Sequence, residues 1–264
     1  MESKSATEEE KNMEGQSQIG KKTVTILCLG DSLTRGYFMR GYKHHPYSYR
    51  LEELLKKRED ELEYDIHNQG IDGYKAVDMK DLYTATVKAQ LESKKGRKHR
   101  REGRAFDIVV ILGGINDLCL NTTPEKVFQG LKETHAAAIQ DGAITVALTV
   151  AEHFQQKTHG ASLEKDIAKL NEMIKSLGSS KTHVIDFAAE FPYFSLSEEE
   201  KRDLWDDGLH YTPQGYDRMG EIVYAELASA VLGTMLKGGK LHNNNKGSGT
   251  ENCICDTTRG CKLA

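Results

Sequence analysis

Residues 106–113 read FDIVVILG, and this stretch does most to decide the fold. Its apolar residues follow one another without polar alternation, so a strand formed here would be buried on both faces. Strands of that kind belong to parallel sheets that helices cover on both sides. The stretch therefore predicts an α/β protein built on a parallel sheet.

Strand-like and helix-like patterns alternate along the rest of the chain from residue 22 onwards. This alternation implies βαβ units with right-handed crossovers and a mostly parallel sheet covered on both faces. The predicted strands span residues 23–30, 64–68, 106–113, 143–150 and 184–187. Helices are predicted after Pro46, over residues 77–91, from the capping residue Thr123 to Asp141, from Ser162 to Gly178, and from Thr212 towards Leu236.

The composition excludes several classes of protein. The 264 residues include 36 Lys and Arg against 40 Asp and Glu, a net charge of −4. No basic excess therefore points to specific binding of nucleic acid. No apolar run approaches the roughly 18–20 residues that span a bilayer. We expect one domain over residues 22–236, a polar disordered tail at 1–21 without an export signal, and a flexible tail at 237–264.

The five cysteines do not predict a disulfide framework. Cys28 and Cys119 lie in apolar runs, where a buried free thiol is the usual outcome. Cys253, Cys255 and Cys261 crowd the last dozen residues. Since the predicted domain holds only two cysteines, we expect an intracellular, cytoplasmic protein.

Reactive or flexible residues follow three of the predicted strands, where the crevice of a parallel α/β sheet lies. Ser32 follows the first strand in GDSL (residues 30–33); it projects into the crevice or serves as an ordinary turn residue. The second strand is followed by NQGIDG (residues 68–73), where glycine lets a backbone N–H approach a ligand, or where the chain simply turns. The third is followed by Asn116, whose amide could donate to an oxyanion or cap a helix.

A fourth segment, Asp207-Gly208-Leu209-His210, precedes the last predicted helix. The three-residue spacing lets the carboxylate reach the Nδ1–H of the imidazole while Nε2 points elsewhere, as a general-base histidine requires. Metal binding competes with this interpretation when the segment is considered alone. The occurrence of all four segments in order favours catalysis.

The four segments together resemble the blocks of the SGNH/GDSL hydrolase superfamily, from the first predicted strand to the last predicted helix. The resemblance implies a flavodoxin-like, three-layer αβα sandwich with a five-stranded parallel sheet. It also implies ester hydrolysis with no metal and no organic cofactor. By the same resemblance the nucleophile is Ser32, the oxyanion hole includes Gly73 and Asn116, and the acid–base pair is Asp207 and His210.

The chemistry of the residues leads to the same mechanism. His210 takes the proton of Ser32, which attacks the ester carbonyl, while Asp207 orients and stabilises the imidazolium. The backbone N–H groups of Ser32 and Gly73, with the Asn116 side chain, hold the oxyanion. Water then releases the acyl group with His210 again as base.

We therefore expect a serine esterase that acts on a small or lipid-like carboxylic ester. A thioesterase or a carbohydrate acetylesterase would use the same residues. A protein of another class, a flavodoxin-like binder of a phosphate ligand, would leave the Asp207–His210 pair without a purpose. The neighbouring Asp31 and Asp117 are expected to fix local turns.

Two further regions allow more than one interpretation. The aromatic residues between Tyr37 and Tyr49 form either a rim for the acyl or alcohol group or ordinary loop packing. The adjacent His44 and His45 are expected to lack nearby carboxylate or thiolate ligands, so no metal site is predicted. The basic run at 94–101 is a solvated loop, a nuclear-import patch or a contact for anionic lipid.

The last four residues, Cys261-Lys262-Leu263-Ala264, have the form of a prenylation box. Cys253 and Cys255 could carry the palmitoyl group that stable anchoring requires in addition. The pattern predicts peripheral membrane association through this tail. A disordered tail with incidental cysteines, or weak metal binding by Cys-x-Cys, is the alternative.

Overall fold

The sheet holds five parallel strands in the order β4-β1-β5-β6-β7. The computed structural model describes residues 21–93, 104–154, 156 and 161–233. The strands are β1 (Lys22–Gly30), β4 (Leu62–Gly70), β5 (Ile108–Leu112), β6 (Ile144–Leu148) and β7 (Thr182–Ile185). This order is doubly wound: β4 is added on one side of β1, and β5, β6 and β7 are added on the other side. The predicted α/β class and five-stranded parallel sheet are confirmed.

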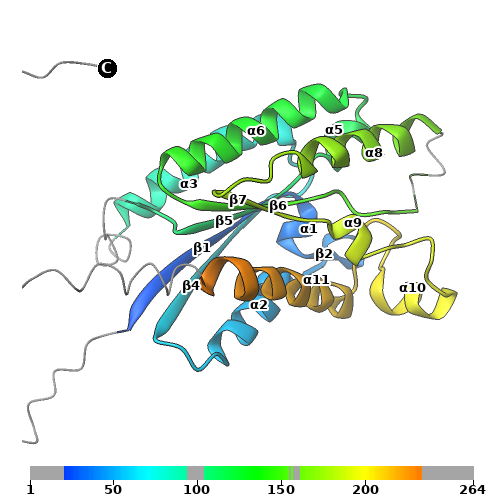
Figure 1. Cartoon of the computed structure of the whole chain (residues 1–264). Coiled ribbons are helices and arrows are strands. Elements are labelled where there is room, and N and C mark those ends of the chain that lie inside the picture. The colour runs from blue at the N-terminus through cyan, green and yellow to red at the C-terminus, as the bar shows by residue number, and fades with distance from the viewer. Residues whose placement is uncertain (1–20, 94–103, 155, 157–160, 234–264) are drawn as a thin grey trace, which may run out of the picture.

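Helices cover both faces of the sheet, as Figure 1 shows. One face carries α2 (Tyr47–Lys56) and α11 (Pro213–Glu226), which continues as η4 (Leu227–Leu232). The opposite face carries α3 (Met79–Glu92), α6 (Pro124–Gln140) and α8 (Ala161–Lys175). Shorter elements lie in the connections: α1 (Ser32–Arg35), β2 (Tyr37–Phe38), η2 (Met39–Gly41), β3 (Lys43–His44), η3 (Ala76–Asp78), α5 (Ile115–Cys119), α9 (Phe187–Glu190) and α10 (Glu198–Leu204).

The alternation of side chains along the central strands divides the core into two layers. Ile26 and Cys28 of β1 pack into the layer under α2 and α11, whereas Leu27 and Leu29 pack into the layer under α3 and α6. All four side chains are fully buried. Because both faces of β1 and β5 are covered, only the carboxyl ends of these strands are left to carry a site.

Two expected boundaries are wrong, those of the last strand and of the start of α8. The last strand spans 182–185 rather than 184–187, because the hydroxyl of Thr182 finds a partner in the Thr145 hydroxyl at 2.9 Å and a polar residue can therefore be buried. Phe187 begins α9 instead. The helix α8 begins at Ala161, before the expected Ser162. Thr123 is the N-cap residue of α6 as expected, although its side chain makes no capping hydrogen bond.

The sequence also carried a signal for α10 that the apolar pattern does not show. Ser197 accepts from the Glu200 N–H, and the Glu200 side chain accepts from the Ser197 N–H, which is a capping box. Within the described residues, no helix is long and apolar enough to cross a membrane. The predicted tails at 1–21 and 237–264, with their cysteine cluster, lie almost wholly outside those residues.

Candidate active site

The chain turns sharply where β1 meets α1, and this turn presents Ser32. The Asp31 carboxylate caps α1 by accepting from the Leu33 N–H at 2.9 Å. Gly36, with φ of 79°, ends the helix after one turn. A side chain at Gly30 would lie 2.5 Å from the Leu112 carbonyl oxygen, so β1 and β5 can approach closely only with glycine there. Ser32 is thereby held at the carboxyl end of β1 with 6% of its surface exposed.

His210 reaches this serine from the loop between α10 and α11. The Ser32 hydroxyl lies 2.9 Å from His210 Nε2, and His210 Nδ1 lies 2.9 Å from Asp207 Oδ2. The other Asp207 oxygen accepts from the backbone N–H groups of Leu209 and His210. Since Nδ1 faces a carboxylate, it carries the proton, and Nε2 is free to accept from the serine hydroxyl. The structure thus brings Ser32, His210 and Asp207 into one hydrogen-bonded chain.

The electrostatics of Asp207 suit this arrangement. Burial acts to raise the pKa of Asp207, but hydrogen bonds from the His210 ring and backbone, with the nearby imidazole charge, outweigh it and lower the pKa to about 2. The carboxylate is therefore ionised at neutral pH. The Tyr37 ring lies against the His210 ring with centroids 4.3 Å apart and restricts its rotation.

The segment that contains Gly73 lies beside the nucleophile turn. The Ile71 N–H donates to the Gly30 carbonyl, and Arg35 of α1 forms a 2.7 Å ion pair with Asp72. Gly73 has φ of 71° with open space where a side chain would be. Its backbone is therefore accessible in a conformation that glycine adopts without strain.

Asn116 extends from the first turn of α5, just past the end of β5. Its Nδ2 donates to the Tyr74 carbonyl at 3.0 Å and approaches Asp31 Oδ2 at 3.4 Å. The neighbouring Asp117 carboxylate accepts from the Ala76 and Val77 N–H groups of the same loop at 2.7 and 3.3 Å. The third loop is thus tied to the second, with the Asn116 amide at their junction. Asp31 and Asp117 hold turns, as the sequence predicts.

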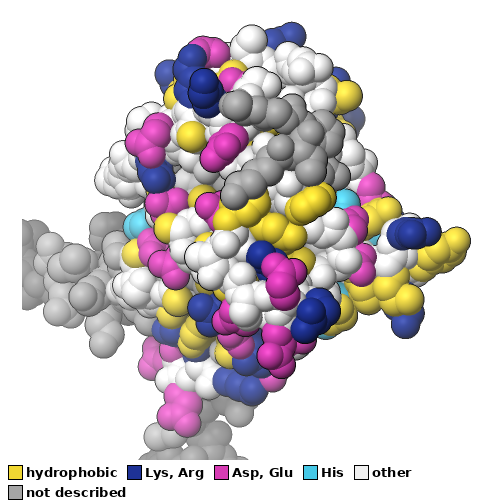
Figure 2. Space-filling model, turned by 90° about the vertical axis from the view of Figure 1, so that its right-hand side faces the viewer, with side chains coloured by type: hydrophobic (Ala, Val, Ile, Leu, Met, Phe, Trp, Pro, Cys, Tyr) yellow, Lys and Arg dark blue, Asp and Glu magenta, His cyan; other side chains and the backbone are white. Residues whose placement is uncertain are grey.

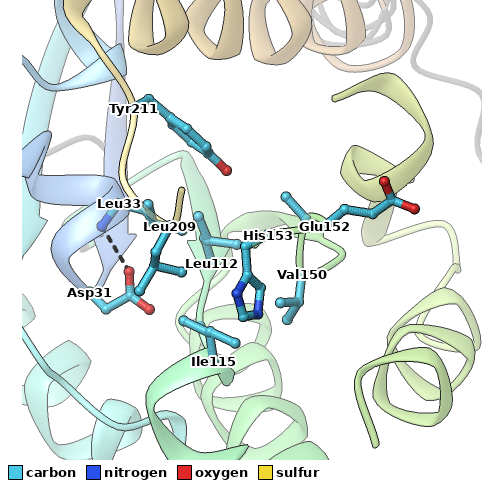
Figure 3. Close-up of a pocket in the computed structure, with 11 residues that line it drawn as sticks. Asp31, Leu33, Leu112, Ile115, Val150, Glu152, His153, Leu209 and Tyr211 are labelled. Atoms are coloured by element: carbon cyan, nitrogen blue, oxygen red, sulfur yellow. Dashed lines mark hydrogen bonds between the residues drawn. The ribbon is translucent and has the colours of Figure 1, made fainter. Parts of the chain in front are cut away.

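A small pocket lies behind the nucleophile turn, and Figure 3 shows the side chains that line it. Asp31 and Leu209 lie on one side, and Val150 and His153 of the loop after β6 lie on the other. The centre of a water molecule can occupy a volume of about 10 Å³ in this pocket, so the pocket has room for one water molecule. Burial, opposed by the Leu33 N–H and the nearby His210, raises the pKa of Asp31 to about 7.

His153 is a pocket residue that the sequence analysis missed. It is 1% exposed, and it follows the end of β6 as Ser32 follows β1. The same rule, a polar residue after a buried strand, would have found it. The loop also contacts the His210 segment, because the Phe154 N–H donates to the Gly208 carbonyl at 2.8 Å.

The aromatic cluster between residues 37 and 49 is not one rim. Tyr47 is fully buried in the core, whereas Tyr42 and Tyr49 are 86% and 59% exposed. The expectation that His44 and His45 lack carboxylates is wrong in three dimensions: His45 pairs with Asp217 at 2.8 Å, and His44 lies 3.8 Å from Asp72. Each histidine has its own carboxylate, and within the described residues no group of metal-ligating side chains occurs.

The arrangement can perform acyl transfer. It offers a serine hydroxyl beside a neutral imidazole, a carboxylate behind that imidazole, and N–H donors on loops after β4 and β5. An α/β sandwich with such an edge has the groups that acyl transfer by a serine hydroxyl requires.

Residues 28–218 match the GDSL-like Lipase/Acylhydrolase family, and the chain belongs to that family. Since the match covers most of the chain, the protein is an ester hydrolase. A search of curated protein sequences found no match.

Solved structures share the fold at low sequence identity. A member of the lipolytic G-D-S-L family from Veillonella parvula superposes with a TM-score of 0.56 at 16% identity, covering 79% of this chain and 98% of that one. A lipase/acylhydrolase from Enterococcus faecalis gives 0.52 at 19% identity, covering 77% and 95%. An acetyl-xylooligosaccharide esterase variant from Geobacillus gives 0.59 at 18% identity, covering 80% and 98%.

Proposed function

We propose that the protein is a serine esterase that hydrolyses small or lipid-like carboxylic esters through a covalent acyl-enzyme. The observation that carries the proposal is the continuous hydrogen-bonded chain from Ser32 through His210 to Asp207, with both links at 2.9 Å. In this proposal Ser32 is the nucleophile and His210 is the general base. Asp207 orients the ring and stabilises its cationic form.

The reaction proceeds in two half-reactions. The Ser32 oxygen attacks the ester carbonyl as its proton passes to His210 Nε2, and the imidazolium then protonates the leaving alcohol. Water, deprotonated by the same nitrogen, attacks the acyl-enzyme and releases the carboxylic acid. Because the pKa of Asp207 is about 2, the carboxylate stays ionised and stabilises the imidazolium in both steps.

The oxyanion is held by donors from three loops in this proposal. They are the backbone N–H groups of Ser32 and Gly73 and the amide of Asn116. The ties from Arg35 to Asp72 and from Asp117 to Ala76 fix these loops before substrate arrives. Donors fixed in advance need no reorganisation as charge develops on the carbonyl oxygen.

The nature of the acyl and alcohol groups is a finer proposal. One structural relative is an acetyl-xylooligosaccharide esterase, so removal of acetyl groups from a carbohydrate is a second candidate on the same residues. A thioester would be cleaved by the same chemistry. The site does not favour a phosphate-binding protein, because a carboxylate paired with His210 orients the ring as a general base and has no role in binding a phosphate.

The C-terminal tail supports a further proposal that rests on sequence alone. Prenylation at Cys261, with acylation at Cys253 or Cys255, would hold a cytoplasmic enzyme at a membrane.

Replacing Ser32 tests the esterase proposal. Ser32→Ala should lower hydrolysis of p-nitrophenyl acetate by at least roughly 10⁴-fold and abolish labelling by a fluorophosphonate. Ser48→Ala is the matched control, because Ser48 is 5% exposed and its hydroxyl accepts from Asn68 rather than meeting a histidine. Residual activity of Ser32→Ala within a few-fold of the parent would contradict the assignment. A series of p-nitrophenyl esters of increasing acyl length then separates short-chain from long-chain substrates.

A further inference from the structure

The segment that follows the nucleophile differs in composition from the rest of the chain. Residues 32–51 contain no Asp or Glu, although the whole chain has 40. The same stretch contains four Lys or Arg residues, two histidines and five aromatic residues. Residues 36–45 of this stretch form a projecting hairpin, which we call the basic hairpin.

The base of the basic hairpin is fixed to the catalytic edge of the fold. The His45 N–H donates to the Gly36 carbonyl at 2.7 Å, and β2 pairs with β3 in antiparallel fashion above this closure. The Tyr216 hydroxyl on α11 donates to the Tyr37 carbonyl at 2.7 Å. The Met39 N–H donates to the Asp206 carboxylate at 2.7 Å. Hydrogen bonds to its backbone therefore hold the hairpin in place, and the side chains at its tip take no part in these bonds.

The tip of the hairpin adopts a costly backbone conformation. Met39 and Arg40 have φ of 50° and 54°, followed by Gly41 at 81°. A non-glycine residue in this region costs roughly 1–3 kcal/mol, and such strain persists where the surroundings fix it, often at functional sites. Here the surroundings are the hydrogen bond to Asp206 and the closed base.

The strained tip presents apolar and cationic side chains together. Met39 is 48% and Tyr42 is 86% exposed. Arg40 and Lys43 are exposed beside them, and neither has an ion-pair partner in the part of the chain that the structure describes. Figure 2 looks onto this edge of the molecule and shows a projection that carries hydrophobic and basic side chains at its right-hand margin.

The hairpin also borders the candidate catalytic centre. The Tyr37 ring at its base lies against the His210 ring, and the hairpin follows α1, which begins with Ser32. A surface that contacts Met39 and Tyr42 would therefore meet the molecule beside the crevice.

We propose that the basic hairpin docks the enzyme on an anionic lipid surface, with Met39 and Tyr42 entering the interface and Arg40 and Lys43 contacting the headgroups. Tyrosine favours this boundary because its ring is apolar and its hydroxyl is polar. Unpaired Lys and Arg are attracted to anionic leaflets. A folded protein partner needs roughly 800 Å² on each side for a stable interface, which a narrow tip with two exposed apolar side chains does not offer.

Docking in this orientation would bring a lipid-borne ester to Ser32. That consequence rests on the proposed function, whereas the docking itself does not. Binding is therefore measured with the inactive Ser32→Ala background, so that failure to dock and failure to hydrolyse are separate results.

The first experiment is co-sedimentation of the full chain with vesicles of phosphatidylcholine alone or with added phosphatidylserine. We expect stronger binding to the anionic vesicles. Arg40→Gln with Lys43→Gln should weaken it about 25-fold, which is about fivefold for each charge. Met39→Ser with Tyr42→Ser should weaken it on the order of tenfold.

Matched controls separate the tip from general surface effects. Lys126→Gln with Lys132→Gln removes two exposed charges from α6, and Leu120→Ser removes an apolar side chain that is 67% exposed. Neither control should change vesicle binding more than about twofold. In the Ser32 parent background, all the variants should keep the parent rate on a soluble ester.

A second experiment locates the tip in the bilayer. Trp205 is the sole tryptophan and is 5% exposed inside the domain, so it reports on no membrane contact. Tyr42→Trp places a second indole at the tip. Vesicles that contain brominated acyl chains should quench the fluorescence of this variant and leave that of the parent unchanged.

Four results would overturn the proposal. The parent could fail to bind anionic vesicles, or bind them equally well with the tip substituted, in which case another part of the chain makes the contact. Light scattering could show a dimer that the Met39 and Tyr42 substitutions dissociate, in which case the tip is an interface between two copies. Absence of quenching in Tyr42→Trp on bound vesicles would also refute the placement.

Discussion

Replacement of Asn116 by alanine tests the proposed oxyanion hole most directly. One hydrogen of Nδ2 is engaged by the Tyr74 carbonyl at 3.0 Å, and the 3.4 Å approach to Asp31 is too long to hold the other firmly. One N–H is therefore available to a developing oxyanion. A preorganised donor of this kind contributes about 2.7–4 kcal/mol, so kcat should fall by roughly 10²–10³. KM should change little, because the charge exists only in the transition state.

The same substitution also removes a structural hydrogen bond, and the assay has to separate the two effects. Loss of the bond to Tyr74 should lower the free energy of unfolding by about 1–3 kcal/mol, which a denaturant titration measures. Asn68→Ala is the matched control. Asn68 donates to the Thr34 carbonyl at 2.8 Å beside the same crevice, yet it has no role in the proposed chemistry.

Comparison of Asn116→Ala with Asn68→Ala decides whether Asn116 is an oxyanion donor. We expect both variants to lose stability and only Asn116→Ala to lose kcat by more than about tenfold. If the two variants lose kcat equally, the loss reports loop disorder and not an absent donor. If KM rises while kcat holds, Asn116 binds the substrate in its ground state, and its assignment to the oxyanion hole is wrong.

Three further predictions follow from the geometry and the charges. Asp207→Asn should lower kcat by roughly 10⁴-fold with an unchanged circular dichroism spectrum, because an amide favours the wrong tautomer of His210; a loss below about tenfold would contradict the assigned role. Asp31 has a pKa near 7 in the fold against 3.8 in an unfolded chain, so the native state binds more protons between these values and stability should fall as pH rises through them. Denaturation midpoints at about pH 5 and about pH 8 measure this fall, and Asp31→Asn should reduce it; an equal fall in both proteins would assign it to other groups. Cys261→Ser should move the protein from the membrane fraction to the soluble fraction of eukaryotic cells and leave soluble ester hydrolysis intact; a parent that is already soluble, with a C-terminal peptide of unmodified mass, would refute lipidation.

The sequence predicts the central sheet well because burial on both faces leaves a clear pattern. The runs at 23–30 and 106–113 became β1 and β5, and both pack into the two core layers. The edge strand β7 was misplaced because its polar Thr182 is satisfied by a hydroxyl on β6, a partner that no local pattern reveals. The pattern therefore fails where a tertiary partner replaces apolar character.

The candidate site could be predicted for a different reason. Chemistry at the edge of a parallel sheet needs reactive residues directly after strands, so Ser32 and Asn116 stand out by position alone. Contacts across long sequence separations could not be found this way. The contact of Tyr37 with His210 and the pairing of His45 with Asp217 depend on the basic hairpin, whose two-residue strands are too short to give a periodic pattern.

A common arrangement underlies much of the candidate site: Ser32, Gly73, Asn116 and Asp207 each have an acidic neighbour in the sequence, whereas His210 has none. Asp31 caps the helix that begins at Ser32, and Asp117, next to Asn116, accepts from two N–H groups of the preceding loop.

The same division holds for the remaining loops. Asp72 pairs with Arg35 beside Gly73, and Asp206 holds the basic hairpin beside Asp207. Each of these carboxylates already has a partner within the protein. Removing one of them should therefore displace the reactive neighbour and not eliminate its chemistry. Four acidic residues thus hold the loops that border the crevice, and the groups proposed to react lie on the residues next to them and on His210.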